Sequence, residues 1–222
     1  MYRFNKKTLA FTLAELLMVL GIIGVVATIT LPNLGDSADQ QVNVAKAKKV
    51  YSELSSAWDK YSLKHDIPSS MSAEAVMAAM KANLKTKGTS YIYTPDVAAC
   101  TTNTSCNNIS SLLPDGSTFS ANMYSKDSVN FVNVYFDVDG PNKGDNTIGS
   151  DIFCASITFN SASADTPSLE PFMQTETLTN MSSIMTSGNA ATADNGLLWI
   201  LTYDNMDYNN CTVNWVTKTT CN

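Results

Sequence analysis

The chain has 222 residues, and its 14 basic and 20 acidic residues give a formal net charge of −6. That length suffices for one globular domain with a core plus an accessory segment. Three basic residues, Arg3, Lys6 and Lys7, stand in the first ten positions, so the remainder carries a net charge of −9. An acidic body argues against binding to a phosphate backbone, and no nucleic-acid partner is expected.

An apolar segment follows this basic start. The stretch from Phe11 to Leu31 comprises 21 residues with a single charge, Glu15. A helix of that length spans about 31 Å, which is enough to cross the hydrocarbon core of a bilayer. Because positive charge precedes the segment, we expect the short leader in the cytoplasm and the body outside.

Glu15 is the informative residue of this segment. A carboxylate inside an apolar helix costs about 2.5–3.5 kcal/mol on insertion scales, so it indicates a function and needs a partner. If the chain is cut between Ala10 and Phe11, the new α-amino group lies about one helical turn from Glu15. An amine on a neighbouring copy would then neutralise the carboxylate and favour one axial register.

Residues 6–34 closely resemble the class III signal of type IV pilins and type II secretion pseudopilins. In that family a short basic leader ends in a small residue, and the mature chain begins with Phe followed by T-L-x-E-L-L. The corresponding run here is FTLAELL, starting at Phe11. Ala10 stands where the family usually has Gly, and we expect this small residue still to allow cleavage. The family also tends to place a proline where Pro32 stands.

The resemblance implies a structural filament subunit, cleaved by a prepilin peptidase, N-methylated at Phe11 and polymerised through its N-terminal helix. Its implied partners are other copies or sister pilins, an assembly ATPase, an inner-membrane platform protein and membrane lipid. The precursor would lie in the inner membrane, and the product in an extracellular pilus or a periplasmic pseudopilus. An ordinary secretory signal peptide, cut after Ala27, is the alternative, and it accounts poorly for Glu15 and for the long span.

The second half of this helical region has a different pattern. Residues 37–64 are predicted to continue as helix, with Ser37 and Gln40 as a capping box. Pro32 and Gly35 predict a kink between the halves. An apolar stripe at alternating spacings of three and four should pack against the globular domain. Its members are Val44, Ala47, Tyr51, Leu54, Trp58 and Tyr61.

The remaining elements follow in chain order. A short helix is predicted over residues 72–86 with Ser72 as its cap. After Gly88 the composition becomes typical of β-strands. Residues 160–195 are polar and are expected to form a surface insertion with a short helix at 175–185. The predicted strands are residues 117–124, 129–138, 152–159, 196–203 and 212–217.

These elements predict an α+β fold with three parts: a cleaved leader (1–10), a hydrophobic assembly helix (11–34) and a globular domain (35–222). A long N-terminal α-helix, hydrophobic in its first half, would pack through its second half on an antiparallel sheet. The family resemblance implies the same arrangement, a pilin-like roll.

The five cysteines have no C-x-x-C spacing, so a zinc site of the usual kind is not expected. Export to an oxidising compartment favours disulfides. The two local pairings that we favour are Cys100–Cys106 and Cys211–Cys221, and Cys154 is then left over. Sequence alone leaves the connectivity open.

An aspartate-rich stretch between two predicted strands contains Asp137, Asp139, Asp145 and Asp151. It looks like a segment found in many pseudopilin-like proteins, and some relatives bind calcium in a loop of their globular domain. Clustered carboxylates suit calcium. Asp, Asn, Gly and Pro also make turns without any cation, and we expect the role of this stretch to be mainly structural, with calcium binding as the alternative.

No catalytic constellation appears, so an enzyme is not expected. The chain has one histidine, His65, and lacks both the G-x-S-x-G elbow and the phosphate-binding loop. The competing hypothesis to a filament subunit is a membrane-tethered extracytoplasmic binding or adhesin domain that does not polymerise. Glu15 distinguishes the two, because a monomeric tether gains nothing from that carboxylate.

Overall fold

The computed structural model describes residues 12–91, 109–126, 129–144, 146–159, 166–172 and 195–216. For residues 26–38, 90, 91, 109 and 126 it describes the backbone alone. The chain forms two compact units, Met1–Asp39 and Gln40–Asn222.

Helix α1 (Leu13–Ser62) is one α-helix of 50 residues with parts in both units. It has no break at Pro32 or Gly35, so the prediction that the helix continues after residue 37 is confirmed, and there is no helix N-terminus at Ser37 for the predicted capping box. A proline removes one backbone donor, and a helix this long retains its other hydrogen bonds. The kink at Pro32 stays a prediction.

The part of α1 in the second unit supplies one side of the hydrophobic core. Val50, Leu54 and Trp58 are fully buried, and they belong to the same cluster as the inner face of the sheet. The Trp58 ring meets the ring of Phe159 edge-on at a centroid distance of 6.2 Å. Its indole Nε1 donates to the carbonyl oxygen of Pro167 at 2.7 Å, so this large buried side chain has its one polar group satisfied.

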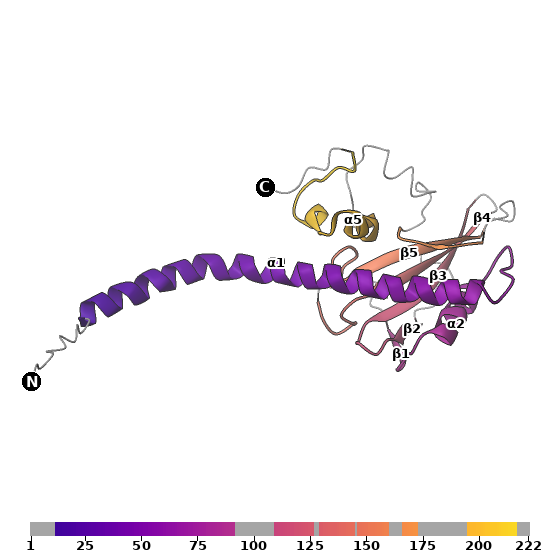
Figure 1. Cartoon of the computed structure of the whole chain (residues 1–222), viewed down its shortest axis with the longest axis horizontal. Helices are drawn as coiled ribbons and strands as arrows, with labels where there is room; N and C mark the ends of the chain where they lie inside the picture. The colour runs from indigo at the N-terminus through magenta and orange to yellow at the C-terminus, as the bar shows by residue number, and fades with distance from the viewer. Residues whose placement is uncertain are drawn as a thin grey trace, which may run out of the picture. The chain divides into compact units, whose positions relative to one another are not determined.

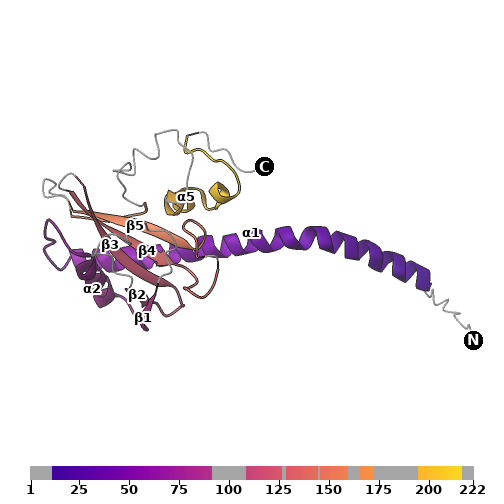
Figure 2. The same cartoon turned by 180° about the vertical axis from the view of Figure 1, so that it is seen from behind.

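The sheet of the second unit has six antiparallel strands that are neighbours in space in the order in which they occur in the chain. Figure 1 shows β1 to β5 fanned out side by side, and Figure 2 shows them from behind. The strands are β1 (Gly88–Tyr91), β2 (Ile109–Leu112), β3 (Thr118–Lys126), β4 (Val129–Asp137), β5 (Ile152–Phe159) and β6 (Leu169–Glu170).

The register of the central strands explains which face is apolar. Phe119 of β3 lies opposite Phe136 of β4, which lies opposite Phe153 of β5, and all three are buried in the core cluster. Because side chains alternate along a strand, their neighbours point to the other face. That face carries buried polar residues, among them Thr118, Asn133 and Ser156.

Helix α2 (Ala73–Asn83) confirms the prediction of a short helix in this region. The Ser72 hydroxyl accepts a hydrogen bond from the backbone N–H of Ala75 at 3.2 Å, so Ser72 is the N-cap, as predicted. Val76 and Met80 lie on its buried face, and α2 packs against β3.

The C-terminal part departs from the prediction. Residues 196–203 form helix α5 (Gly196–Tyr203) instead of a strand, and a single 3₁₀ turn, η2 (Asp207–Asn209), follows. Residues 212–216, which were predicted as part of a strand, form no strand within the described part of the chain. An apolar run of eight residues fits a buried helix as well as a strand. Asp204 then ends α5 in the left-handed region, at φ 61°.

The predicted fold therefore needs correction, although the coarse class, α+β, holds. The sheet starts at residue 88 instead of 117, and it gains β1, β2 and β6, which the sequence did not predict. The C-terminal segments assigned to it are α5 and an irregular stretch, so the pilin-like roll with a strand-rich C-terminus is not what is found. The predicted insertion helix at 175–185 lies outside the described residues.

Candidate functional site

The first turns of α1 expose an apolar surface. Every residue from Thr12 to Val25 is exposed, and the large apolar side chains among them are 51–78% accessible. Large contiguous apolar patches on a protein surface mark binding sites for other proteins or for membranes. The side chains are Leu13, Leu16, Leu17, Met18, Val19, Leu20, Ile22, Ile23 and Val25.

At the start of this helix, Glu15 is hydrogen-bonded to Thr12. Its carboxylate Oε2 accepts from the Thr12 backbone N–H and from the Thr12 hydroxyl, each at 2.8 Å. The Glu15 backbone N–H donates to the Thr12 hydroxyl oxygen at 3.3 Å. These reciprocal bonds are a capping box, T-x-x-E, which satisfies orphan donors of a helix N-terminus.

The capping box changes how Glu15 is interpreted. Sequence reasoning looked for a capping box at Ser37 and overlooked the same signal at Thr12 and Glu15. Glu15 therefore has a partner within its own chain, in addition to the amine proposed for it. Ala10 and Phe11, which define the predicted cleavage point, lie outside the described residues.

No helix is both long enough and apolar enough to span a membrane within the part of the chain that was searched, which is the described part.

The aspartate-rich segment forms the connection between β4 and β5. Asp137, fully buried at the end of β4, accepts through Oδ1 from the backbone N–H groups of Asp139 (3.1 Å) and Gly140 (2.8 Å). Gly140 has a φ of 92°, and a Cβ there would lie 2.6 Å from the carbonyl oxygen of Gly116. The carboxylate thus fixes a turn that only glycine fits.

Asp151, just before β5, anchors the other end of this connection. Its two carboxylate oxygens accept from the backbone N–H groups of Asn146 (2.8 Å) and Thr147 (2.7 Å). The carboxylates of Asp139 and Asp151 both approach Gly144. Asp145, the fourth predicted calcium ligand, lies outside the described residues.

A calcium ion requires six to eight oxygen ligands. Asp151 and one oxygen of Asp137 are already engaged by backbone donors. Among the described side chains, no group of three or more acidic, cysteine or histidine residues is placed to hold a metal ion. The geometry supports the structural reading, in which carboxylates hold the turn.

Burial gives Asp137 unusual acid–base behaviour. The pKa of its carboxyl group is raised to about 7, mainly by removal from water; the two backbone hydrogen bonds oppose this rise, and the neighbouring Asp139 carboxylate adds to it. The second oxygen, Oδ2, is buried without a hydrogen-bond partner, as is Oδ1 of Asp139. A proton on Asp137 would supply a hydrogen-bond donor where these two buried oxygens can only accept.

The cysteines divide between described and undescribed positions. Cys211 is half-buried and disulfide-bonded, but no disulfide joins two cysteines of the described residues, so its partner is not among them. The Cys211–Cys221 and Cys100–Cys106 pairings therefore stay predictions, since Cys100, Cys106 and Cys221 lie outside the description. Cys154 is buried in β5, and its thiol donates to the carbonyl oxygen of Ala155 at 3.6 Å.

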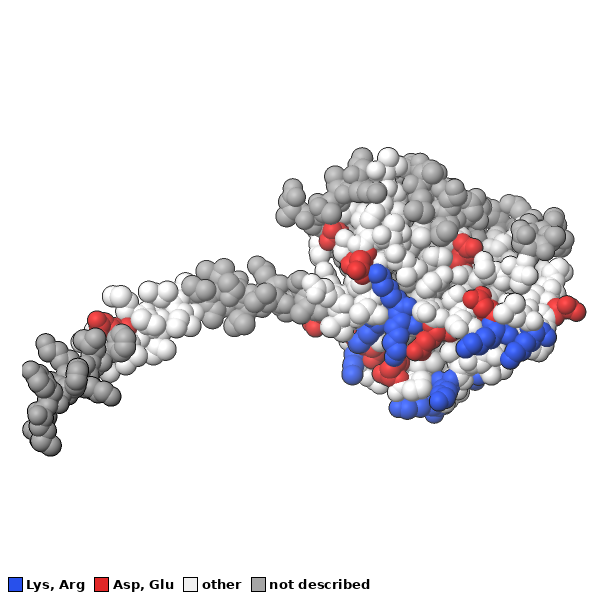
Figure 3. Space-filling model, viewed as in Figure 1, with Lys and Arg blue, Asp and Glu red and all other residues white. Residues whose placement is uncertain are grey.

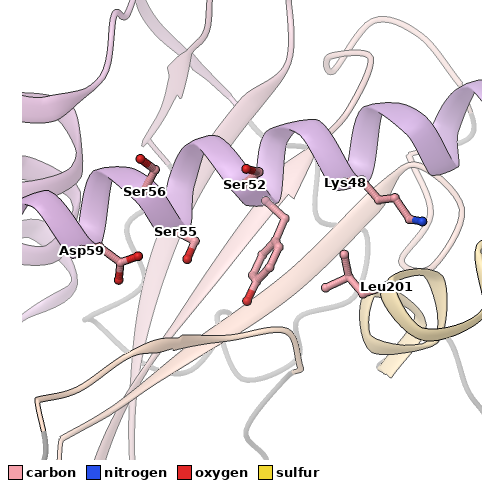
Figure 4. A pocket seen from close by; sticks show the side chains of 7 residues that line it. Lys48, Ser52, Ser55, Ser56, Asp59 and Leu201 are labelled. Carbon is pink, nitrogen blue, oxygen red and sulfur yellow. The ribbon is translucent and has the colours of Figure 1, made fainter.

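An open groove of about 420 Å³ lies along α1 beside α5 (Figure 4). Its polar groups are largely engaged: the Lys48 amine pairs with Asp204 at 2.6 Å, and the Tyr51 hydroxyl donates to the carbonyl oxygen of Leu169 at 2.9 Å. Burial raises the pKa of Tyr51 to about 12, so it stays protonated. The other lining residues are Ser52, Ser55, Ser56, Asp59 and Leu201.

Comparison of the chain with protein-family models, with curated proteins and with solved structures gave no match. The functional argument therefore rests on the residues of this chain, and above all on the exposed apolar start of α1.

Proposed function

We propose that this protein is a structural subunit of a type IV pilus-like or pseudopilus-like filament, which polymerises through the N-terminal part of α1. The observation that carries the proposal is the exposed apolar surface from Leu13 to Val25. In water such a surface is unfavourable at about 25 cal/mol for each Å² of apolar area, so another apolar surface must cover it. Copies of the same helix, and lipid before assembly, supply that cover.

The sequence around this surface supports the same function. The run FTLAELL after a basic leader matches the processing signal described above. We propose cleavage between Ala10 and Phe11 by a prepilin peptidase, with N-methylation of Phe11. The precursor would sit in the inner membrane, and the mature subunit would join an extracellular pilus or a periplasmic pseudopilus. Because we propose no enzymatic site in this chain, an assembly ATPase would supply the energy for polymerisation. A platform protein would supply the scaffold.

Cleavage is tested by N-terminal sequencing of the mature protein. We expect the first residue to be a methylated Phe11. A first residue of Thr28, the product of an ordinary signal peptidase, or an intact Met1 would contradict the proposal.

The role of Glu15 is tested by variants that separate its charge from its hydrogen bonds to Thr12 in the capping box. Glu15→Ala removes both the charge and the acceptor for Thr12, whereas Glu15→Gln keeps an acceptor at the same position and removes only the charge. If the carboxylate pairs with an amine of a neighbouring copy, both variants should be stable in the membrane but absent from filaments. Sheared surface or periplasmic filaments would be counted by electron microscopy.

A matched control is Thr12→Ala, which breaks the capping box and leaves the charge. It should retain assembly, with a helix start weakened by about 1 kcal/mol. Normal filaments from Glu15→Gln together with loss in Thr12→Ala would show that the cap, and not the charge, is what matters. Normal filaments from all three variants would show that assembly needs neither the charge nor the cap, whereas no filaments from the wild-type chain would favour a tethered domain that does not polymerise.

A further inference from the structure

The start of α1 contains very few polar side chains. Glu15 is the only charged residue of positions 12–25, and Thr12 carries the only other polar side chain of that stretch. Figure 3 shows these turns as uncharged atoms with acidic atoms at their start and no basic atoms on the visible face. Thr12 is therefore the only side chain of the stretch that can donate a hydrogen bond to the Glu15 carboxylate.

The backbone offers the carboxylate few donors as well. Inside an α-helix each N–H bonds to the carbonyl oxygen four residues earlier, and this pattern starts at Leu16, whose N–H reaches the Thr12 carbonyl oxygen at 3.2 Å. Free N–H groups remain only in the first turn. The Thr12 N–H and the Thr12 hydroxyl both donate to Glu15 Oε2 at 2.8 Å. Bonds of this kind to an ionised oxygen are stronger than bonds between neutral groups.

The α-amino group proposed as the partner of Glu15 exists only after the chain is cut. In the precursor the nitrogen of Phe11 belongs to the peptide bond with Ala10, so it carries no positive charge. The precursor must nevertheless hold Glu15 in an apolar segment, where a carboxylate without partners is costly. Glu15 Oε1 makes no hydrogen bond or ion pair with any described residue, so it remains for an amine that arrives later.

We propose that Thr12 is a positioning residue that satisfies the Glu15 carboxylate in the membrane precursor, before cleavage creates an α-amino group to pair with it. This inference rests on the proposed function, which places the start of α1 in a bilayer and cuts the chain before Phe11. It adds an order of events. Hydrogen bonds within one chain hold Oε2 first, and the ion pair with a neighbouring copy forms at Oε1 afterwards.

Membrane insertion of the uncleaved chain tests this role. The 222-residue precursor would be synthesised with inverted inner-membrane vesicles that contain a translocon and lack a prepilin peptidase. The ratio of chain that resists alkaline extraction to chain that does not would be measured. Thr12→Val removes the hydroxyl, keeps the backbone N–H and makes the segment more apolar, so hydrophobicity alone would improve insertion. We expect the opposite, a fall in this ratio of about threefold or more, because a bond to a charged group is lost.

Three matched variants separate this role from a purely structural one. Thr12→Ser keeps the hydroxyl and should insert as the wild type does. Thr28→Val makes the same chemical change further along the segment and should insert at least as well as the wild type. In a Glu15→Ala background, Thr12→Val should no longer reduce insertion. A threonine that only capped the helix would still be needed in that background, because its hydroxyl also accepts from the backbone N–H of position 15.

An equal loss from Thr12→Val with and without Glu15→Ala, or no loss in either background, would overturn this inference. Filaments of wild-type subunits that begin at Phe11 would in that case leave the proposed function standing. If insertion depended on Thr12 only when Glu15 is present, but the wild-type chain were neither cut before Phe11 nor assembled, the proposed function would fail and the role of Thr12 would stand.

Discussion

The two halves of α1 are parts of one helix with opposite surroundings. From Leu13 to Val25 every side chain is exposed, whereas Val50, Leu54 and Trp58 are fully buried. The first half is apolar on all sides, and the second has an apolar stripe flanked by Lys, Ser, Glu and Asp. A stripe finds its cover within the same chain, while a helix that is apolar all round needs cover from outside.

The largest expected effect compares one leucine from each half. Leu54→Ala should lower the free energy of unfolding by about 2–5 kcal/mol, because it leaves a cavity in the core. Leu17→Ala, at an exposed position, should leave that free energy unchanged and should reduce filament yield. Denaturant unfolding of the full chain in mild detergent can be followed by tryptophan fluorescence, since Trp58, Trp199 and Trp215 all belong to the second unit. Equal destabilisation by both variants would contradict the comparison.

The second effect depends on pH and concerns the second unit alone. The folded-state pKa of Asp137, about 7, lies above the ordinary value of 3.8, so the folded state holds a proton that the unfolded state has lost between these pH values. The free energy of unfolding should therefore fall as pH rises from about 4 to 7, by on the order of 4 kcal/mol, and then level off.

Asp137→Asn should abolish most of this dependence and be more stable than the wild type at pH 8. The amide oxygen can still accept from Asp139 and Gly140, and the amide carries no charge to bury. Asp66→Asn, at an exposed position of the same unit, is the control and should keep the wild-type pH profile. If the free energy of unfolding of Asp137→Asn fell between about pH 4 and 7 as steeply as that of the wild type, other groups would be responsible for the pH dependence.

The third effect concerns the C-terminal end. If Cys211 is bonded to Cys221, the closed loop of about ten residues should contribute roughly 2–3 kcal/mol to the stability of the second unit, less any strain. Non-reducing peptide mapping would identify the pair, and a Cys211→Ser/Cys221→Ser variant should lose that stability without added reductant. A map that joins Cys211 to Cys100 or Cys106 would contradict this connectivity.

The smallest expected effect is that of calcium. A ligand that binds only the folded state stabilises it by about 2.7 kcal/mol at a hundredfold excess over its dissociation constant. Because backbone donors already occupy the oxygens of Asp151 and one oxygen of Asp137, we expect the same melting temperature with calcium as with a chelator. A rise of several degrees that is lost in Asp139→Ala would show that the turn is a calcium site.

Local patterns were sufficient for the elements whose residues carry a single signal. Helix α2 and its cap at Ser72 were predicted, as were β3, β4 and β5. The strands β1, β2 and β6 were not predicted, because they are short, from two to four residues, and largely polar. Such strands acquire their conformation from pairing with a neighbour, so their own residues give little indication.

The candidate sites divide in the same way. The unusual position of Glu15 in an apolar run was evident from the sequence, but its bonds to Thr12 were not foreseen. The aspartates of the β4–β5 connection were identified by type, while their roles depend on which backbone N–H groups the turn brings to them. Hydrogen bonds of that kind depend on a few tenths of an ångström, which spacing alone does not define.

The sequence by itself determined the contrast between the two halves of α1, because helical periodicity shows directly which side chains share a face. Only the tertiary structure decided that Gly196–Tyr203 is a helix. An unbroken apolar run satisfies the core in either conformation, and the choice depends on neighbours that are distant in sequence. Here Leu197 and Ile200 join the main core, while Leu198 and Trp199 pack with Phe172, Val213 and Trp215 on the other side of α5.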